Sequence, residues 1–279
     1  MDNLPDDKTS PQDIERYAKK LVGKTFYNVL EEEFHGNLLE EKAAYYDNPR
    51  GKGSLGNLLE EHYFFYQPNS ESEPDFAEAG TELKVTPYEV TKKGKHRAGE
   101  RLVIGMIPNS EPIEENFYKS HLLRKMRLIL LIFYLRSREK RRTEYSIDYV
   151  TLFSILSEKY KEDLIIIKDD YRRIVEKIKA GKAHELSEGD TRYLGACTKG
   201  STAERSLQPQ YYNDSIPAKR RAFSLKQSYM SYLINHYLLQ EAETADAAFS
   251  QEELERMDLE AEVIRRIDQY KGKTEEELC

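Results

Sequence analysis

Residues 82–85 restrict the fold of this chain more than any other stretch, because charged and apolar side chains alternate along them. A period of two is typical of a β-strand with one face in the core. Glu82 and Lys84 would project from one face, while Leu83 and Val85 would enter the core on the other. Residues 128–135 form a continuous apolar run, which predicts a buried strand and is too short to span a bilayer. Both segments argue against an all-helical protein.

A second acidic residue precedes the alternating stretch. Asp75 follows a proline and comes before a glycine-bearing turn, so its carboxylate can return to the same end of the sheet as Glu82. Carboxylate oxygens are the ligands that hard divalent cations prefer, and a lysine beside them can position or deprotonate water. Asp75, Glu82 and Lys84 therefore suit the hydrolysis of a phosphodiester. The same spacing also occurs as two exposed acids and a lysine on a half-buried hairpin.

Several further blocks of sequence occur in a fixed order around this acidic set. They are residues 52–60, 181–189, 193–194, 198–200 and 221–226. Together with Asp75 and residues 82–84, they resemble the MutH-like nucleases of the PD-(D/E)xK class. That family includes the mismatch-repair nicking endonuclease MutH and type II restriction endonucleases that cut at GATC. The resemblance spans roughly residues 15–240.

The resemblance implies an α/β, restriction-endonuclease-like fold, with helices flanking a mixed β-sheet and a cleft for duplex DNA. It implies a type II restriction endonuclease that cuts double-stranded DNA at GATC with Mg²⁺. Asp75 and Glu82 would bind the cation, Glu60 would support it, and Lys84 and Lys125 would aid the attack of water.

The resemblance also implies a recognition region. It maps to Lys199, after a strand predicted at 193–198, and to residues 221–226, predicted as a turn into a helix. The candidates for DNA contacts there are Lys199, Arg221, Ser224 and Lys226. Ser224 stands where the family's nicking member has a tyrosine linked to reading adenine methylation, so the response to methylation stays open.

The charge of the chain is unevenly distributed. A formal net charge of −7 is unusual for a DNA-binding protein. Residues 84–142, however, hold 15 Lys and Arg against 6 Asp and Glu, whereas residues 241–279 hold 13 acidic against 5 basic residues. The middle of the chain can therefore attract phosphates. Lys92, Lys93 and Lys95 lie at the tip of a hairpin predicted over residues 88–107 and are candidates for contacts with the DNA backbone.

Local signals predict several helices. Ser10 and Pro11 mark the start of a helix that runs to about residue 21, and a second helix follows Gly23-Lys24-Thr25 and ends at residue 33. Ser54 is a predicted cap for a helix whose apolar stripe precedes Glu60. Further helices are predicted at 161–180, 226–240 and 251–270, and the first of these has an apolar face that includes Ile165.

The end of the chain repeats its beginning. Residues 270–278 match residues 21–29, with Gly272-Lys273-Thr274 aligned to the earlier Gly-Lys-Thr. We therefore expect a catalytic domain at 1–250, a C-terminal helix at 251–270, and the possible start of a second MutH-like domain at 271–279. Cleavage of both strands needs two active centres, so either that second half or a homodimer on a palindromic site is expected.

Two alternative functions stay open at this point. The first is a MutH-like mismatch-repair nicking endonuclease, and the second is a catalytically silent DNA-binding or allosteric module. The two cysteines form no disulfide framework and the N-terminus lacks a signal peptide. We therefore expect a cytoplasmic protein that has no contact with a membrane.

Overall fold

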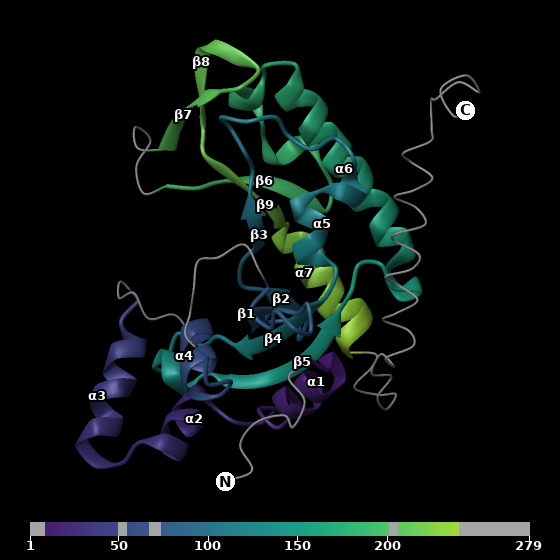
Figure 1. Cartoon of the computed structure of the whole chain (residues 1–279). Coiled ribbons are helices and arrows are strands. Elements are labelled where there is room, and N and C mark those ends of the chain that lie inside the picture. The colour runs from purple at the N-terminus through teal and green to yellow at the C-terminus, as the bar shows by residue number, and fades with distance from the viewer. Residues whose placement is uncertain (1–8, 50–54, 67–73, 201–205, 240–279) are drawn as a thin grey trace. The chain divides into compact units, whose positions relative to one another are not determined.

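The structure, a computed structural model (Figure 1), describes residues 9–49, 55–66, 74–200 and 206–239. These residues form two compact units, each assembled from separate segments. Unit 1 contains the described residues up to 102, together with 128–153 and 227–239, and unit 2 contains 103–127 and the described residues of 154–226. No described helix combines the length and the apolar character needed to cross a membrane. The predicted helix at 251–270, the repeat at 271–279 and Ser54 lie outside the described residues.

A four-stranded mixed sheet in the order β2–β1–β4–β5 forms the centre of unit 1. β1 (Glu82–Val90) runs parallel to β4 (Ile129–Leu135), whereas β2 (His96–Ala98) and β5 (Ser146–Phe153) pair antiparallel with β1 and β4. The apolar run predicted as a buried strand is β4, and its first five residues are completely buried. The mixed α/β architecture confirms the predicted fold class.

Helices pack against this sheet as their local sequences predict. Ser10 caps α1 by accepting the Asp13 N–H, and Thr25 caps α2 in the same way with Asn28. α1 packs against β5, α4 against β1 and α7 against β2 (Figure 1). The helices of unit 1 are α1 (Pro11–Lys19), α2 (Phe26–Glu33), α3 (Gly36–Asp47), α4 (Leu55–His62), α7 (Gln227–Leu233) and a π-helix (Ile234–Leu238).

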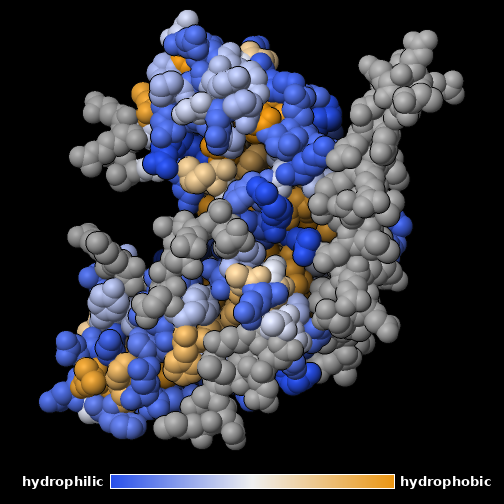
Figure 2. Space-filling model, viewed as in Figure 1, coloured by the Kyte–Doolittle hydropathy of each residue, from blue (hydrophilic) through white to orange (hydrophobic). Residues whose placement is uncertain are grey.

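Unit 2 contains a smaller sheet in the order β3–β9–β6 and a separate β7–β8 hairpin. The surface over β7, β8 and α6 is mostly hydrophilic (Figure 2). The elements of this unit are β3 (Leu102–Met106), α5 (His121–Met126), α6 (Lys161–Lys179), β6 (Leu194–Thr198), β7 (Leu207–Gln210), β8 (Asn213–Lys219) and β9 (Arg221–Leu225). Short 3₁₀ turns occur at Phe117–Lys119, Arg142–Glu144, Glu158–Tyr160, Ala183–Glu185 and Glu188–Asp190 across the two units.

Three local predictions were wrong. In each case, packing against residues far away in the sequence decided which strand pairs or which side chain is buried. The strand that returns beside β1 is the short β2, whereas β3 joins β9 in the other sheet. Residues 221–225 form strand β9, paired antiparallel with β6, and the helix begins only at Gln227. Ile165 is 65% exposed, since the buried face of α6 is formed by Ile167, Tyr171 and Ile174.

Candidate active site

Glu82 and Lys84 lie two residues apart on β1 and therefore share one face of the strand. The ammonium Nζ of Lys84 donates to Glu82 Oε1 at 2.5 Å. Glu82 is only 4% exposed, and Val85 is half-buried. Glu82 and Lys84 share a face and Leu83 is buried at 4% exposure, as predicted, whereas Val85 is only half-buried instead of entering the core. A buried carboxylate is stable only with a partner, and Lys84 provides one.

Asp75 reaches the start of β1 through a tight turn. A β-bridge joins Phe76 to Thr81, and Gly80 adopts a φ of 60° within the loop that this bridge closes. Glycine adopts this left-handed conformation without the strain that a side chain would cause. Asp75 Oδ2 accepts the Leu83 N–H at 2.8 Å, which fixes its carboxylate beside the strand. The predicted return of Asp75 to the end of the strand is confirmed.

Glu60 lies on α4, which packs against β1. Burial, followed by the negative charge of Asp75, raises the pKa of Glu60 to about 7. Glu82 raises this pKa further, whereas the positive charge of Lys84 lowers it. The four side chains therefore form one electrostatic cluster within unit 1. A strongly shifted pKa beside specific charged partners is typical of functional sites.

The three carboxylates of this cluster offer the hard oxygen ligands that Mg²⁺ prefers. Among the described residues, no group of three acidic, histidine or cysteine side chains is arranged as a ready metal site. The Lys84 ammonium already contacts Glu82 Oε1, where it neutralises part of the charge that a cation would neutralise. The residues therefore fit the cation in chemistry, and direct binding at that oxygen requires the ion pair to rearrange.

Sequence reasoning missed a residue beside the cluster, Tyr66. Its backbone N–H donates to the carbonyl of Glu60 at 3.0 Å, and its ring meets Phe76 edge to face. Its hydroxyl is buried and has no hydrogen-bond partner among the described residues. The available signal was the aromatic run at residues 63–66, which directly follows the helix of Glu60.

Lys125 and the three lysines of the basic hairpin tip belong to other segments of the chain than the acidic cluster. Lys125 belongs to unit 2, where it is half-buried on α5 next to Gly105 of β3. Lys92, Lys93 and Lys95 are exposed in the turn between β1 and β2 of unit 1. Their exposure is what a contact with the DNA backbone requires, and that contact stays a prediction.

The recognition candidates in unit 2 differ in exposure. Lys199 is half-buried directly after β6, whereas Ser224 is completely buried on β9. The Arg221 guanidinium donates to the carbonyls of Ala196 and Leu186 at 2.7 and 2.6 Å, and burial lowers its pKa.

Lys226 is also engaged within unit 2. It is 9% exposed, and its ammonium donates to the carbonyls of Glu188 and Thr191, each at 2.5 Å. These bonds favour a structural role for Arg221 and Lys226, and any contact of either side chain with DNA stays a prediction.

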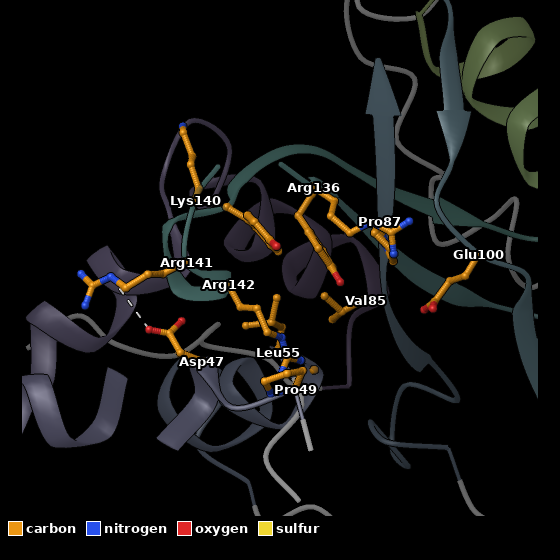
Figure 3. Close-up of a pocket in the computed structure, with 13 residues that line it drawn as sticks. Asp47, Pro49, Leu55, Val85, Pro87, Glu100, Arg136, Lys140, Arg141 and Arg142 are labelled. Atoms are coloured by element: carbon orange, nitrogen blue, oxygen red, sulfur yellow. Dashed lines mark ion pairs between the residues drawn. The ribbon is translucent and has the colours of Figure 1, made fainter. Parts of the chain in front are cut away.

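A pocket of about 750 Å³ opens in unit 1 beside Val85 and Pro87 of β1 (Figure 3). Both residues alternate with Glu82 and Lys84, so the pocket lies on the opposite face of the strand. Its rim is basic, but Arg136 is paired with Glu89 at 2.6 Å. Figure 3 shows another rim side chain, Arg141, directed toward Asp47. Because the pocket lies on the face of β1 opposite to Glu82 and Lys84, it is separate from the acidic cluster.

Two comparisons with known proteins agree with this geometry. Residues 64–170 match the family described as DNA mismatch repair enzyme MutH, and this range includes Asp75, Glu82, Lys84 and Lys125. The chain is also 38% identical over 232 residues to the type II restriction enzyme Sau3AI of Staphylococcus aureus. That match covers 82% of this chain and 46% of the relative, so the chain spans about half the length of the curated relative.

Proposed function

The chain belongs to the MutH-like nuclease family, and from this premise we propose that it hydrolyses phosphodiester bonds of duplex DNA as a type II restriction endonuclease. The observation that carries the proposal is the cluster of Glu60, Asp75, Glu82 and Lys84 around the start of β1. A phosphodiester is an anion, so a site made of carboxylates alone would repel it. A bound cation and a lysine remove that repulsion.

Each residue of the cluster has a distinct role in this proposal. Asp75 and Glu82 hold the divalent cation, and Glu60 supports it from α4. Mg²⁺, when bound, supplies positive charge to the scissile phosphate. Lys84 shares a face of β1 with Glu82 and orients the attacking water from there. Lys125 is assigned the same auxiliary role by the family resemblance.

The sequence that is cut and the assembly that cuts it are also part of the proposal. GATC is the proposed site because of the resemblance described above, and Lys199 is a half-buried recognition candidate directly after β6. Each chain supplies one acidic cluster in its described part. Cleavage of both strands would then require two copies on a palindromic site or a second catalytic half.

Incubation with supercoiled plasmid of known sequence and Mg²⁺, followed by sequencing of the DNA ends, tests this proposal. We expect ends at GATC with 5′-phosphates, and we expect the Glu82→Gln variant to leave the plasmid intact. A plasmid that stays intact with the wild-type protein across Mg²⁺ and protein concentrations would reject the nuclease function and favour a silent DNA-binding module.

The second candidate function is a mismatch-repair nicking endonuclease, which the description of the matching family favours. The same gel separates the two functions. Nicked circles that never become linear, at any protein concentration, indicate a nicking enzyme. Linear product that increases steeply with protein concentration indicates paired active centres and supports the restriction endonuclease.

A further inference from the structure

The hydroxyl of Tyr66 is one of several buried side-chain polar atoms that have no hydrogen-bond partner among the described residues, and together with Glu82 Oε2 it lies at the acidic cluster. Buried polar groups in native proteins are almost always bonded to protein or to ordered water. A buried hydroxyl without a hydrogen bond lowers the stability of the fold, unless a bound molecule forms that hydrogen bond. We therefore ask which molecule the Tyr66 hydroxyl can bind at this site.

The backbone fixes Tyr66 beside the acidic cluster. α4 ends at His62, and Phe65 then adopts a left-handed φ of 53°, which is uncommon for a residue other than glycine. Such strain persists only where the surrounding structure enforces it, and it concentrates at functional sites. The Tyr66 N–H then bonds to the carbonyl of Glu60, and its ring contacts Phe76 with a centroid distance of 5.5 Å. Phe76 is the neighbour of Asp75 in the chain.

The surroundings of the hydroxyl are acidic. Burial, and then the charges of Asp75, Glu60 and Glu82, raise the pKa of Tyr66 above its ordinary value. The hydroxyl therefore keeps its proton and is a donor close to carboxylates, yet none of them accepts its hydrogen bond. A buried water molecule needs two to four polar partners, and a hydroxyl donor in the neighbourhood of several carboxylates can provide them.

We propose that Tyr66 is a positioning residue of the nuclease site, whose hydroxyl binds a water molecule shared with the carboxylates of Glu60 and Asp75. This water belongs to the hydration of the divalent cation that the acids bind, so Tyr66 strengthens cation binding without contacting DNA. The inference rests on the proposed function only through the cation. Groups that orient the immediate surroundings of a bound metal commonly change its affinity by 10–100-fold.

Calorimetric titration of the full chain with Ca²⁺, in the absence of DNA, tests the proposal. Tyr66→Phe keeps the ring contact with Phe76 and removes only the hydroxyl. We expect it to weaken Ca²⁺ binding by about 10-fold while the melting temperature of the metal-free protein stays the same or rises. The matched control is Tyr63→Phe, since the Tyr63 hydroxyl donates to the Tyr17 carbonyl at 2.7 Å. That change should lower the melting temperature and leave Ca²⁺ affinity unchanged.

The outcomes separate this inference from the proposed function. Ca²⁺ binding by Tyr66→Phe as tight as that of the wild-type protein overturns the role of Tyr66. A wild-type protein that binds no Ca²⁺ overturns it together with the cation site. If the wild-type protein binds Ca²⁺ and Tyr66→Phe weakens this binding, the role of Tyr66 is supported even when no DNA is cut. With active protein, Tyr66→Phe should lower kcat in Mg²⁺ and leave KM for DNA unchanged.

Discussion

The predicted catalytic residues of unit 1 and the predicted recognition residues of unit 2 differ in the groups that surround their charged side chains. In unit 1, Glu60, Asp75 and Glu82 influence one another, and the pKa of Glu60 rises to about 7. In unit 2, the cations of Arg221 and Lys226 are bonded to backbone carbonyls of their own unit. Carboxylates that repel one another are stabilised by a bound cation, whereas a lysine bonded to carbonyls already stabilises the fold.

The largest effect that this comparison predicts is on catalysis. Asp75→Asn and Glu82→Gln remove a negative charge from the cluster with little change in shape. DNA cleavage in Mg²⁺ should therefore fall by about 10²-fold or more in each variant. Single-turnover cleavage of a plasmid measures this effect, and circular dichroism checks that both variants are folded. Wild-type cleavage rates in both variants would mean that the site lies elsewhere.

The next effect concerns the stability of unit 2. Lys226→Met leaves two carbonyls without their donor, so the free energy of unfolding should fall by about 1–3 kcal/mol. Urea denaturation measures this change. Lys182→Met is the matched control because Lys182 is exposed, and surface substitutions usually change stability by less than about 0.5 kcal/mol. Unchanged stability combined with lost DNA binding would make Lys226 a recognition residue and contradict the comparison.

Substitutions of Lys199 and of the hairpin lysines should have different effects on the specificity and on the affinity of DNA binding. If Lys199 contacts a base, Lys199→Ala should weaken binding to the GATC site by about 1–3 kcal/mol and should hardly affect random DNA. Lys93→Ala should instead weaken binding to every duplex and reduce the slope of affinity against salt. Fluorescence anisotropy in Ca²⁺ over a range of salt measures both. Equal losses on both DNAs for Lys199→Ala would identify a phosphate contact.

The smallest effect is a stability that depends on pH. The pKa of Glu60 is raised to about 7 from its ordinary value of 4.5, so the folded protein holds this proton more tightly than the unfolded chain. The resulting stability is fully present below pH 4.5 and is lost as the pH rises through about 7. The Glu60→Gln variant has no carboxyl group at this position, so its stability should not decrease in this way as the pH rises through about 7.

In metal-free buffer, Glu60→Gln should therefore melt at the same temperature as the wild-type protein near pH 4.5. Above pH 7 it should melt higher, on the order of 2–4 °C, a difference that allows for the screening of a half-exposed carboxylate by water. Scanning calorimetry in EDTA at both pH values measures the difference. A constant difference across this range would show that the ionisation of Glu60 does not oppose folding.

Local sequence predicted the elements that depend on neighbouring residues. Ser10 predicts the start of α1, since the cap bond to Asp13 spans only three residues. The alternation at residues 82–85 predicts β1, and the proline and glycine around Asp75 predict the turn that returns its carboxylate to Leu83. The family resemblance supplied Glu60, whose role no local pattern in its helix indicates.

The sequence by itself therefore determined the start of α1, the strands β1 and β4, and the turn that returns Asp75 to the start of β1. Only the tertiary structure decided that β3 pairs with β9 and that Glu82 is buried. It also decided that Lys226 bonds to carbonyls 38 and 35 residues earlier in the chain. Caps, turns and strand alternation are contacts between near neighbours, so a short window of sequence contains both partners. Strand pairing, burial and the partner of a buried cation join residues far apart, and their choice depends on how the whole unit packs.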